Sequence, residues 1–195
     1  MWGGRLLDIR FLRSFFANPL RMGAAFPSSP ALAGQITNPI DFARARVIVE
    51  LGPGTGAFTR LLAQRAHPAC RVLALELDSD LATYVAARYP RVEVINAPAQ
   101  RLPEVLAERG IAHVDAVVSG LPFANFSALQ QASVVHAVRA ALRPGGAFVS
   151  YSFVHAQVLP NSRRFRRSLK ELFGRLDIHP VFMNAPPALV YSCVA

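Results

Sequence analysis

Three glycines and two glutamates form the clearest chemical pattern in this sequence. Gly52, Gly54 and Gly56 lie between a short apolar run that contains Glu50 and a helical pattern that begins directly after them. A glycine-rich loop between a strand and a helix turns tightly and lets a ligand approach the backbone, which is typical of a nucleotide site. Glu76 ends the next apolar run, where its carboxylate can accept hydrogen bonds from both hydroxyls of a ribose. The alternative interpretation of Glu76 is an acid that begins the following helix.

The elements that must position these residues follow from the periodicity of the chain. Short β-rich runs occupy 46–51, 71–76, 92–95, 113–119 and 146–154, and helical patterns occupy 57–67, 79–89, 102–109 and 127–142. Strands that alternate with helices predict an α/β fold with a mostly parallel sheet and helices on both faces. A helix near 163–174 and strands near 178–183 and 188–194 are expected to complete a seven-stranded sheet with an antiparallel last strand. Ligands of such sheets bind beyond the carboxyl ends of the strands.

The glycine pattern resembles motif I of the class I S-adenosylmethionine-dependent methyltransferases, and LRPGG at 142–146 resembles the turn before their fifth strand. The same glycines also match a dinucleotide fingerprint, but a dehydrogenase would need a substrate domain that 195 residues do not provide. The resemblance implies the Rossmann-like fold of that class, with S-adenosylmethionine as cofactor and S-adenosylhomocysteine as product. The residues that it places at the cofactor are Glu50, Gly52, Gly54, Gly56, Glu76, Leu77, Asn96, Ala97, Ala99 and Ser119.

One position departs from the pattern of the class. Many members carry an acidic residue after the third strand that contacts the adenine amine, whereas the sequence NAPAQ places Pro98 there. Proline has no side-chain acceptor. The candidates for this contact are therefore Asn96, Gln100 and the backbone of Ala99.

The run SGLPF at 119–123 ends the fourth expected strand and indicates the acceptor. It resembles the Asn-Leu-Pro-Tyr or Asn-Leu-Pro-Phe motif of ribosomal RNA adenine dimethyltransferases, whose Asn binds the adenine amine while the aromatic residue stacks on the flipped base. Gly120 replaces that Asn here. A primary alkyl amine needs less activation by the protein than the adenine amine does. Burial beside a cationic sulfonium lowers the pKa of its ammonium form from a reference of roughly 10.4 and so favours the nucleophilic free amine. We expect the small Gly120 to leave room for a nitrogen that gains methyl groups.

Four stretches extend the resemblance over nearly the whole chain. NPLRMGAAFPSSPALA (18–33), SGLPF, LPNSRRF (159–165) and NAPPALVYS (184–192) together resemble the soluble-type bacterial phosphatidylethanolamine N-methyltransferases. The resemblance implies mono-, di- and trimethylation of this aminophospholipid toward phosphatidylcholine. The residues expected in catalysis are Ser119, Gly120, Leu121, Pro122 and Tyr151, and those expected to bind the substrate are Ser28, Ser29, Phe123, His155, Arg163 and Arg164. Tyr151 and His155 are expected to follow the fifth strand; a buried structural role is their alternative.

Other functions stay open as alternatives. Methylation of another aminolipid such as ornithine lipid is one, and ribosomal RNA adenine N6-methylation is another. A third is a nucleotide-binding membrane adaptor without activity.

Composition and charge suggest where such a protein works. The hydrophobic content of 52% and the length of 195 residues favour one well-buried domain. The net charge is +9, and it lies mainly at the flanks, +4 in residues 1–46 and +5 in residues 160–175. Such flanks suggest a polyanionic partner, either a membrane or nucleic acid. We expect an anionic membrane, no nucleic acid, a monomer, and a cytoplasmic protein bound peripherally to the inner membrane. The alternative is a solvated basic face.

The expected organisation has two parts. Residues 1–45 would form an N-terminal amphipathic helix and a lid, and residues 46–195 would form the methyltransferase domain. A helical wheel of residues 5–16 gathers apolar side chains on one arc, so this segment is expected to lie in a bilayer interface or to dock on the core. Residues 23–30 are the expected lid, with a plain connector as the alternative. Cys70 and Cys193 are expected to be buried thiols, and no metal-ligand spacing is present.

Overall fold

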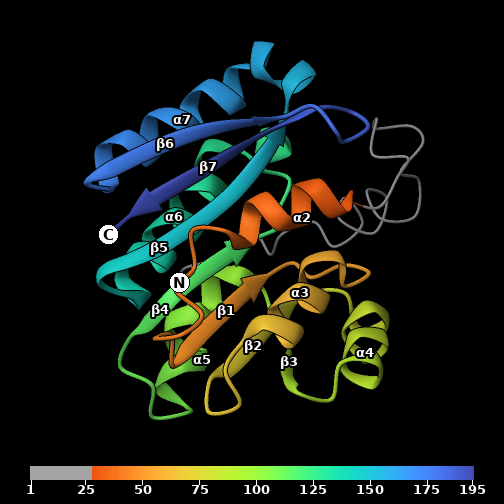
Figure 1. Cartoon of the computed structure of the whole chain (residues 1–195). Helices are drawn as coiled ribbons and strands as arrows, with labels where there is room; N and C mark the ends of the chain where they lie inside the picture. Colours follow the sequence, from red (N-terminus) through yellow and green to blue (C-terminus); the bar gives the residue numbers. More distant parts are fainter. Residues whose placement is uncertain (1–27) are drawn as a thin grey trace.

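The computed structural model describes residues 28–195, and within them the strands form one seven-stranded sheet in the order β3-β2-β1-β4-β5-β7-β6 (Figure 1). Strand β7 runs antiparallel to both of its neighbours, and the other pairings are parallel. The strands are β1 (Val47–Leu51), β2 (Arg71–Glu76), β3 (Val92–Asn96), β4 (Val114–Ser119), β5 (Leu142–Phe153), β6 (Arg175–Val181) and β7 (Ala188–Val194). The predicted fold class is therefore confirmed.

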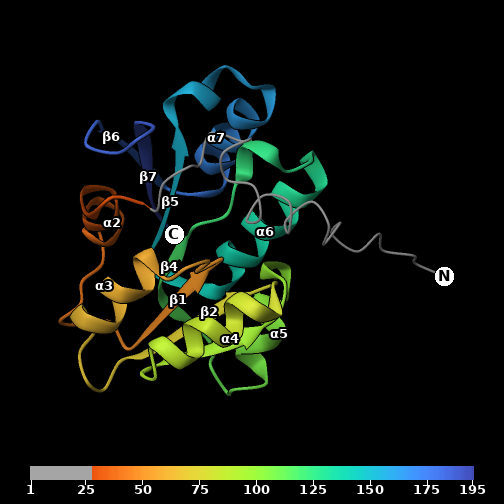
Figure 2. The same cartoon turned by 90° about the vertical axis from the view of Figure 1, so that its right-hand side faces the viewer.

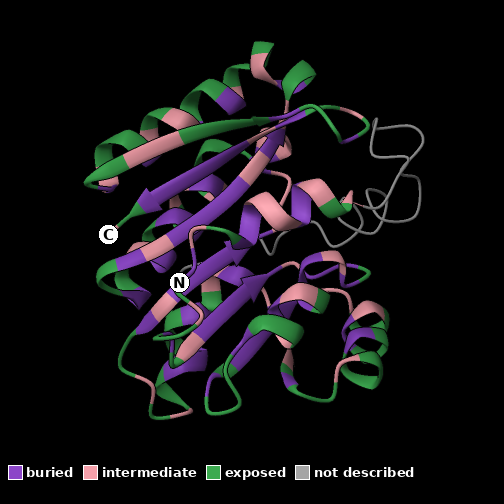
Figure 3. Cartoon of the chain, in the orientation of Figure 1, coloured by how far each residue is buried: buried purple, intermediate pink, exposed green. Residues whose placement is uncertain are grey.

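Helices cover both faces of the sheet. They are α2 (Pro30–Thr37), α3 (Ala57–Arg65), α4 (Ser79–Arg88), α5 (Leu102–Ala107), α6 (Ala128–Ala141) and α7 (Pro160–Leu172), with short 3-10 helices η2 (Ala99–Arg101), η3 (Phe123–Asn125) and η4 (Val154–Val158). Apolar residues of α2 and α3 bury one face of the sheet, and those of α5, α6 and α7 bury the other. Strands β1, β2, β4 and β7 are consequently mostly buried, whereas the edge strand β6 is largely exposed (Figure 3).

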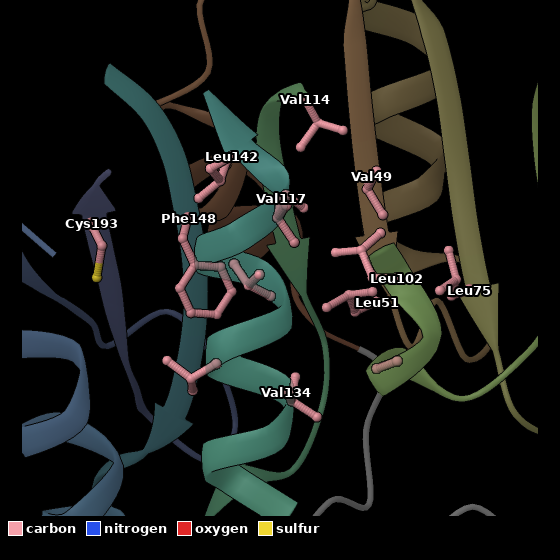
Figure 4. Packing of buried hydrophobic residues seen from close by; sticks show 14 of the residues in the cluster. Val49, Leu51, Leu75, Leu102, Val114, Val117, Val134, Leu142, Phe148 and Cys193 are labelled. Atoms are coloured by element: carbon pink, nitrogen blue, oxygen red, sulfur yellow. The ribbon is translucent and has the colours of Figure 1, made fainter. Parts of the chain in front are cut away.

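The larger of the two cores lies between the sheet and helices α5 to α7. Figure 4 shows Val49, Leu51 and Val117 of the sheet beside Leu102 of α5 and Val134 of α6. Cys193 is also part of this core, and both cysteines are buried free thiols, as predicted.

Three element boundaries differ from the prediction. Strand β5 begins at Leu142 rather than at 146, because Leu142 pairs with Val114 across a register shift and the LRPGG run belongs to the strand. Helix α7 begins at Pro160 rather than at 163, because proline is well suited to the first turn of a helix. Strand β6 also begins earlier, at Arg175.

The expected N-terminal helix at 5–16 and most of the expected lid at 23–30 lie outside the described residues. The part of residues 1–45 that the structure describes is not a separate layer. Leu32 and Ile36 of α2 are fully buried against α3 and the sheet. Within residues 28–195, no helix has both the length and the apolar character that crossing a membrane requires.

Candidate active site

The register of the sheet brings the predicted site residues to one edge. Leu51 at the end of β1 pairs with Leu75 of β2 and with Ser119 of β4, and Ser119 pairs with Ser150 of β5. Figure 2 views the chain from the side on which β1 and β4 end. Residues that lie far apart in the sequence therefore meet where parallel sheets bind their ligands.

The loop after β1 makes its turn through three glycines. Gly52, Gly54 and Gly56 have φ angles of 70°, 55° and 88°, a region that favours glycine. The amide of Gly54 donates a hydrogen bond to Glu76 Oε2 at 3.0 Å. A Cβ on Gly56 would lie 2.5 Å from the ring of Tyr89, whose hydroxyl donates to the Gly56 carbonyl. The loop is thus held by packing and by the neighbouring strand.

Glu76 is 2% exposed and has a fixed orientation. Its Oε1 accepts from the amide of Asp78 at 3.0 Å while its Oε2 accepts from Gly54. Burial raises the pKa of Glu76, and these backbone amides offset part of the rise. Each carboxylate oxygen has a further lone pair, so Glu76 can accept additional hydrogen bonds from a ligand at the end of β2.

Glu50 is fully buried and has no partner in hydrogen-bonding geometry on either carboxylate oxygen within the described part of the chain. Burial raises its pKa to about 7; the nearby Thr59 offsets part of the rise, and the charge of Glu76 adds to it. A buried carboxylate without partners is unfavourable unless a ligand or proton satisfies it. Glu50 therefore marks a place where a cationic or hydrogen-bond-donating ligand group would be stabilised.

A first cavity, here called the Glu76 cavity, opens beside this loop. Its lining consists of Gly52, Leu75, Glu76, Leu77, Ala97, Pro98, Ala99, Gln100, Leu121, Phe126 and Val134. Gln100 Oε1 is buried and has no hydrogen-bond partner among residues 28–195. Of the three candidates for the adenine contact, Gln100 thus offers a free side-chain acceptor.

Asn96 does not line the Glu76 cavity. Its side-chain amide donates to the carbonyls of Glu76 and Leu77, at 2.9 and 3.0 Å, so it holds the loop that follows β2. Ala97 and Ala99 do line the cavity through short side chains and backbone.

Gly120 lies directly against the glycine loop. A Cβ on Gly120 would lie 2.6 Å from the carbonyl oxygen of Gly52, and its amide donates to the Leu51 carbonyl at 2.9 Å. The expectation that Gly120 leaves room for the acceptor nitrogen is therefore wrong, because backbone fills that space. Ser119 is fully buried, and its hydroxyl accepts from the Leu121 amide at 3.3 Å, so it shapes this turn.

A second cavity, here called the Tyr151 cavity, lies on the other side of Leu121. Its lining consists of Gly120, Leu121, Pro122, Phe123, Ala124, Asn125, Tyr151, Ser152, Phe153, His155, Ala156 and Leu159. Tyr151, Phe153 and His155 form an aromatic row, with successive ring centroids 5.6 Å apart. The Ser152 hydroxyl is buried without a partner in the described chain. Sequence reasoning missed Ser152 and Phe153, since nothing distinguishes them from other strand residues.

Tyr151 belongs to β5 itself rather than to the segment after it, whereas His155 lies exposed in η4. Burial raises the pKa of the Tyr151 hydroxyl above its ordinary value, and a hydrogen bond with the Ser28 side chain partly offsets the rise. The phenol is therefore neutral near pH 7. Ser28 therefore contacts Tyr151, but it does not itself line the Tyr151 cavity.

Phe123 is a core residue, although it forms part of the cavity wall. It is 1% exposed, its ring stacks on Phe165 of α7 with centroids 4.0 Å apart, and Phe126 packs against its edge. One face of Phe123 is thus already covered. This placement argues against the expected substrate-binding role of Phe123.

Three other expected substrate contacts lie elsewhere. The Ser29 hydroxyl caps α2 by accepting from the Leu32 amide at 3.1 Å. Arg163 and Arg164 are exposed on α7 and do not line the Tyr151 cavity; Arg164 donates to Asn161 Oδ1. The structure therefore does not bring these residues together with Tyr151.

Comparison with known proteins defines the class. A family model described as a methyltransferase domain matches residues 48–146. The fold is similar to that of a Bacillus cereus O-methyltransferase in complex with S-adenosylhomocysteine, with a TM-score of 0.70 and 17% identity over 99% of this chain and 94% of that one. The chain belongs to the class I S-adenosylmethionine-dependent methyltransferases.

Two curated relatives are informative about the acceptor. An ornithine lipid N-methyltransferase of Singulisphaera acidiphila is 34% identical over 186 residues, which cover 94% of this chain and 93% of that protein. A ribosomal RNA small subunit methyltransferase A of Acidobacterium capsulatum is 40% identical, but only over 75 residues, 38% of this chain and 25% of that protein.

S-adenosylmethionine is the cofactor of this class, and the residues present fit it. The glycine turn allows close approach of a ligand, Glu76 has an oriented carboxylate, and Glu50 and Gln100 carry buried oxygens without partners.

Proposed function

We propose that this chain transfers methyl groups to the amine of an aminolipid head group, with phosphatidylethanolamine as the substrate and three successive methylations toward phosphatidylcholine. Support for an aminolipid comes from the similarity to an ornithine lipid N-methyltransferase, which extends over nearly the whole length of both chains. Ornithine lipid is for this reason the second candidate substrate. The similarity to ribosomal RNA methyltransferases covers a much smaller part of the chain.

The observation that carries the proposal is the contact between Gly120 and Gly52. Because a Cβ at residue 120 would lie 2.6 Å from the Gly52 carbonyl oxygen, a side-chain acceptor at this position, where adenine methyltransferases of the resembling type carry Asn, would require the glycine turn to shift. The stack of Phe123 on Phe165 further removes an aromatic face that a flipped base would use. An alkyl amine needs neither feature, since its lone pair is localised.

The Tyr151 cavity suits a neutral amine. None of its lining residues is an acid, so an ammonium group that enters loses hydration without gaining a carboxylate partner. Such an environment lowers the pKa of the ammonium and favours the nucleophilic free amine. The Tyr151 and Ser152 hydroxyls are available to orient it, and the turn from Ser119 to Pro122 fixes its position relative to the cofactor.

S-adenosylmethionine supplies the methyl group when bound. In this proposal the Glu76 carboxylate holds the ribose, Gln100 Oε1 accepts from the adenine amine, and Gly52, Gly54 and Gly56 allow close approach of the cofactor. Glu50 lies beneath the loop, where its charge favours a cationic ligand. Leu77, Ala97 and Ala99 form the walls of the adenine site.

We place the reaction at the cytoplasmic face of the inner membrane, with the protein bound peripherally. The proposal draws support from the basic segments, since each Lys or Arg near an anionic surface contributes on the order of 1 kcal/mol. Residues 160–175 carry a net charge of +5.

The test is incubation of pure protein with radiolabelled S-adenosylmethionine and one acceptor at a time. The acceptors are anionic vesicles with phosphatidylethanolamine, the same vesicles with ornithine lipid, and ribosomal RNA. We expect label in mono-, di- and trimethylated phosphatidylethanolamine. Label in ornithine lipid alone would identify ornithine lipid, and not phosphatidylethanolamine, as the aminolipid substrate. Label in RNA alone would overturn the proposal.

A further inference from the structure

Five large apolar side chains face solvent on two neighbouring segments, one of which contributes Leu159 to the lining of the Tyr151 cavity. Val158, Phe182 and Met183 are 70%, 75% and 82% exposed, and Val154 and Leu159 are each 41% exposed. We call these five residues the apolar rim. Large apolar groups at such exposure mark an interaction surface when they gather at one place.

The rim residues come from two segments that lie side by side. Val154, Val158 and Leu159 belong to η4 or follow it directly, and Phe182 and Met183 lie in the connection between β6 and β7. The Val154 amide donates to the Pro187 carbonyl at 2.9 Å, and Phe153 pairs with Ala188 in the sheet. Both segments therefore lie where β5 ends and β7 begins.

The charge next to the rim is positive. Arg163, Arg164 and Arg167 are exposed on α7, which begins directly after Leu159, and none of them forms a salt bridge with a described residue. The buried stripe of α7, formed by Ser162, Phe165 and Leu169, faces the opposite way into the core. Apolar side chains beside unpaired cations match a bilayer interface with anionic lipids. Nucleic acid would match the arginines but not the exposed Phe182 and Met183.

Building on the proposed function, we propose that the apolar rim inserts into the interface of an anionic membrane, so that the Tyr151 cavity opens directly onto the lipid head groups. The arginines of α7 then lie at the level of the lipid phosphates. In this arrangement the amine reaches the cavity while its acyl chains stay in the bilayer.

The test removes the apolar surface without a change in charge. The variant is Phe182→Gln with Met183→Gln, and the matched control is Tyr84→Gln, a 48% exposed aromatic on α4. Full-length proteins are sedimented with vesicles of phosphatidylethanolamine and phosphatidylglycerol, and turnover is measured on the vesicles and on short-chain phosphatidylethanolamine below its critical micelle concentration. We expect the variant to lose at least tenfold in vesicle binding and vesicle turnover. Binding of S-adenosylhomocysteine and turnover on the dispersed lipid stay unchanged, and the control behaves like the wild type.

The outcomes separate this inference from the proposed function. Vesicle binding by the variant equal to that of the wild type would overturn the docking surface. A wild type that methylates neither form of the lipid would overturn the proposed function instead, while the sedimentation result would still decide on the rim.

Discussion

The carbonyl oxygen of Gly52 blocks the position that a side chain on Gly120 would take, because the distance from this oxygen to an added Cβ would be only 2.6 Å. The contact joins the turn after β1 to the turn after β4, and the hydrogen bond from the Gly120 amide to the Leu51 carbonyl holds the two together. Gly120 is thus required for the packing of the two turns, because a side chain at this position would displace the Gly52 carbonyl.

Gly120→Ala is expected to separate the two turns. Overpacking of this kind destabilises by roughly 1 to 3 kcal/mol, and we expect turnover on phosphatidylethanolamine to fall at least tenfold. Thermal unfolding and the labelled methyl assay measure the two effects. Gly34→Ala is the control: nothing lies within 4 Å of its added Cβ, and alanine in α2 stabilises by up to about 1 kcal/mol. Methylation of RNA by Gly120→Asn would contradict this explanation.

The buried Glu50 makes stability depend on pH. Its pKa is about 7 in the folded protein and near 4.5 when unfolded, so the folded state binds the extra proton between these values. The contribution of Glu50 protonation to the free energy of unfolding is fully present below pH 4.5 and is lost as pH rises through 7. For a shift of this size the loss is about 3 kcal/mol. Glu50→Gln removes this loss. Urea unfolding at pH 5 and pH 8 measures it, with Glu104→Gln on the exposed side of α5 as control. A wild type equally stable at both pH values would refute the assignment.

Removal of the Glu76 carboxylate is expected to weaken the cofactor site in two ways. Glu76→Ala deletes the proposed ribose acceptor and also leaves the amides of Gly54 and Asp78 without their partner. We expect the Kd of S-adenosylhomocysteine in calorimetry to rise at least tenfold. Glu93→Gln on β3, an exposed residue paired with Arg71, is the control. An unchanged Kd for Glu76→Ala would remove it from the ribose role.

Gln100 is expected to recognise adenine. Gln100→Leu removes the buried Oε1, and loss of one neutral hydrogen bond of about 0.5 to 1.5 kcal/mol corresponds to a Kd higher by roughly 2- to 10-fold. The sharper measurement compares S-adenosylhomocysteine with its inosine analogue, in which oxygen replaces the amine. The wild type should prefer the adenine form, and Gln100→Leu should reduce the preference. Gln64→Leu, exposed on α3, should leave it intact. Equal preference in wild type and variant would assign the contact to backbone.

The fold was largely predictable because its signals are local. The parallel strands read as apolar runs, and the glycine turn and Glu76 lie at their ends. The boundary of β5 was missed because Pro144 and Gly145 indicate a turn, whereas pairing with β4 continues across a register shift. Such pairing depends on the neighbouring strand and leaves no local pattern.

The acceptor site was less predictable because its contacts join distant segments. The stack of Phe123 on Phe165, and the contact of Gly120 with Gly52, depend on how η3, α7 and the β1 turn pack together. Motif resemblance could name these residues but not say which of their faces were already covered.

Leu121 forms part of the wall of both cavities, and its side chain lies against Gly52. A ligand that moves Leu121 in one cavity therefore changes the shape of the other. By thermodynamic linkage the effect is reciprocal, so whatever factor an acceptor lipid applies to the affinity for cofactor, the cofactor applies to the affinity for lipid. This single leucine therefore makes the strength of the coupling between the two substrates a property that can be altered by changing one side chain.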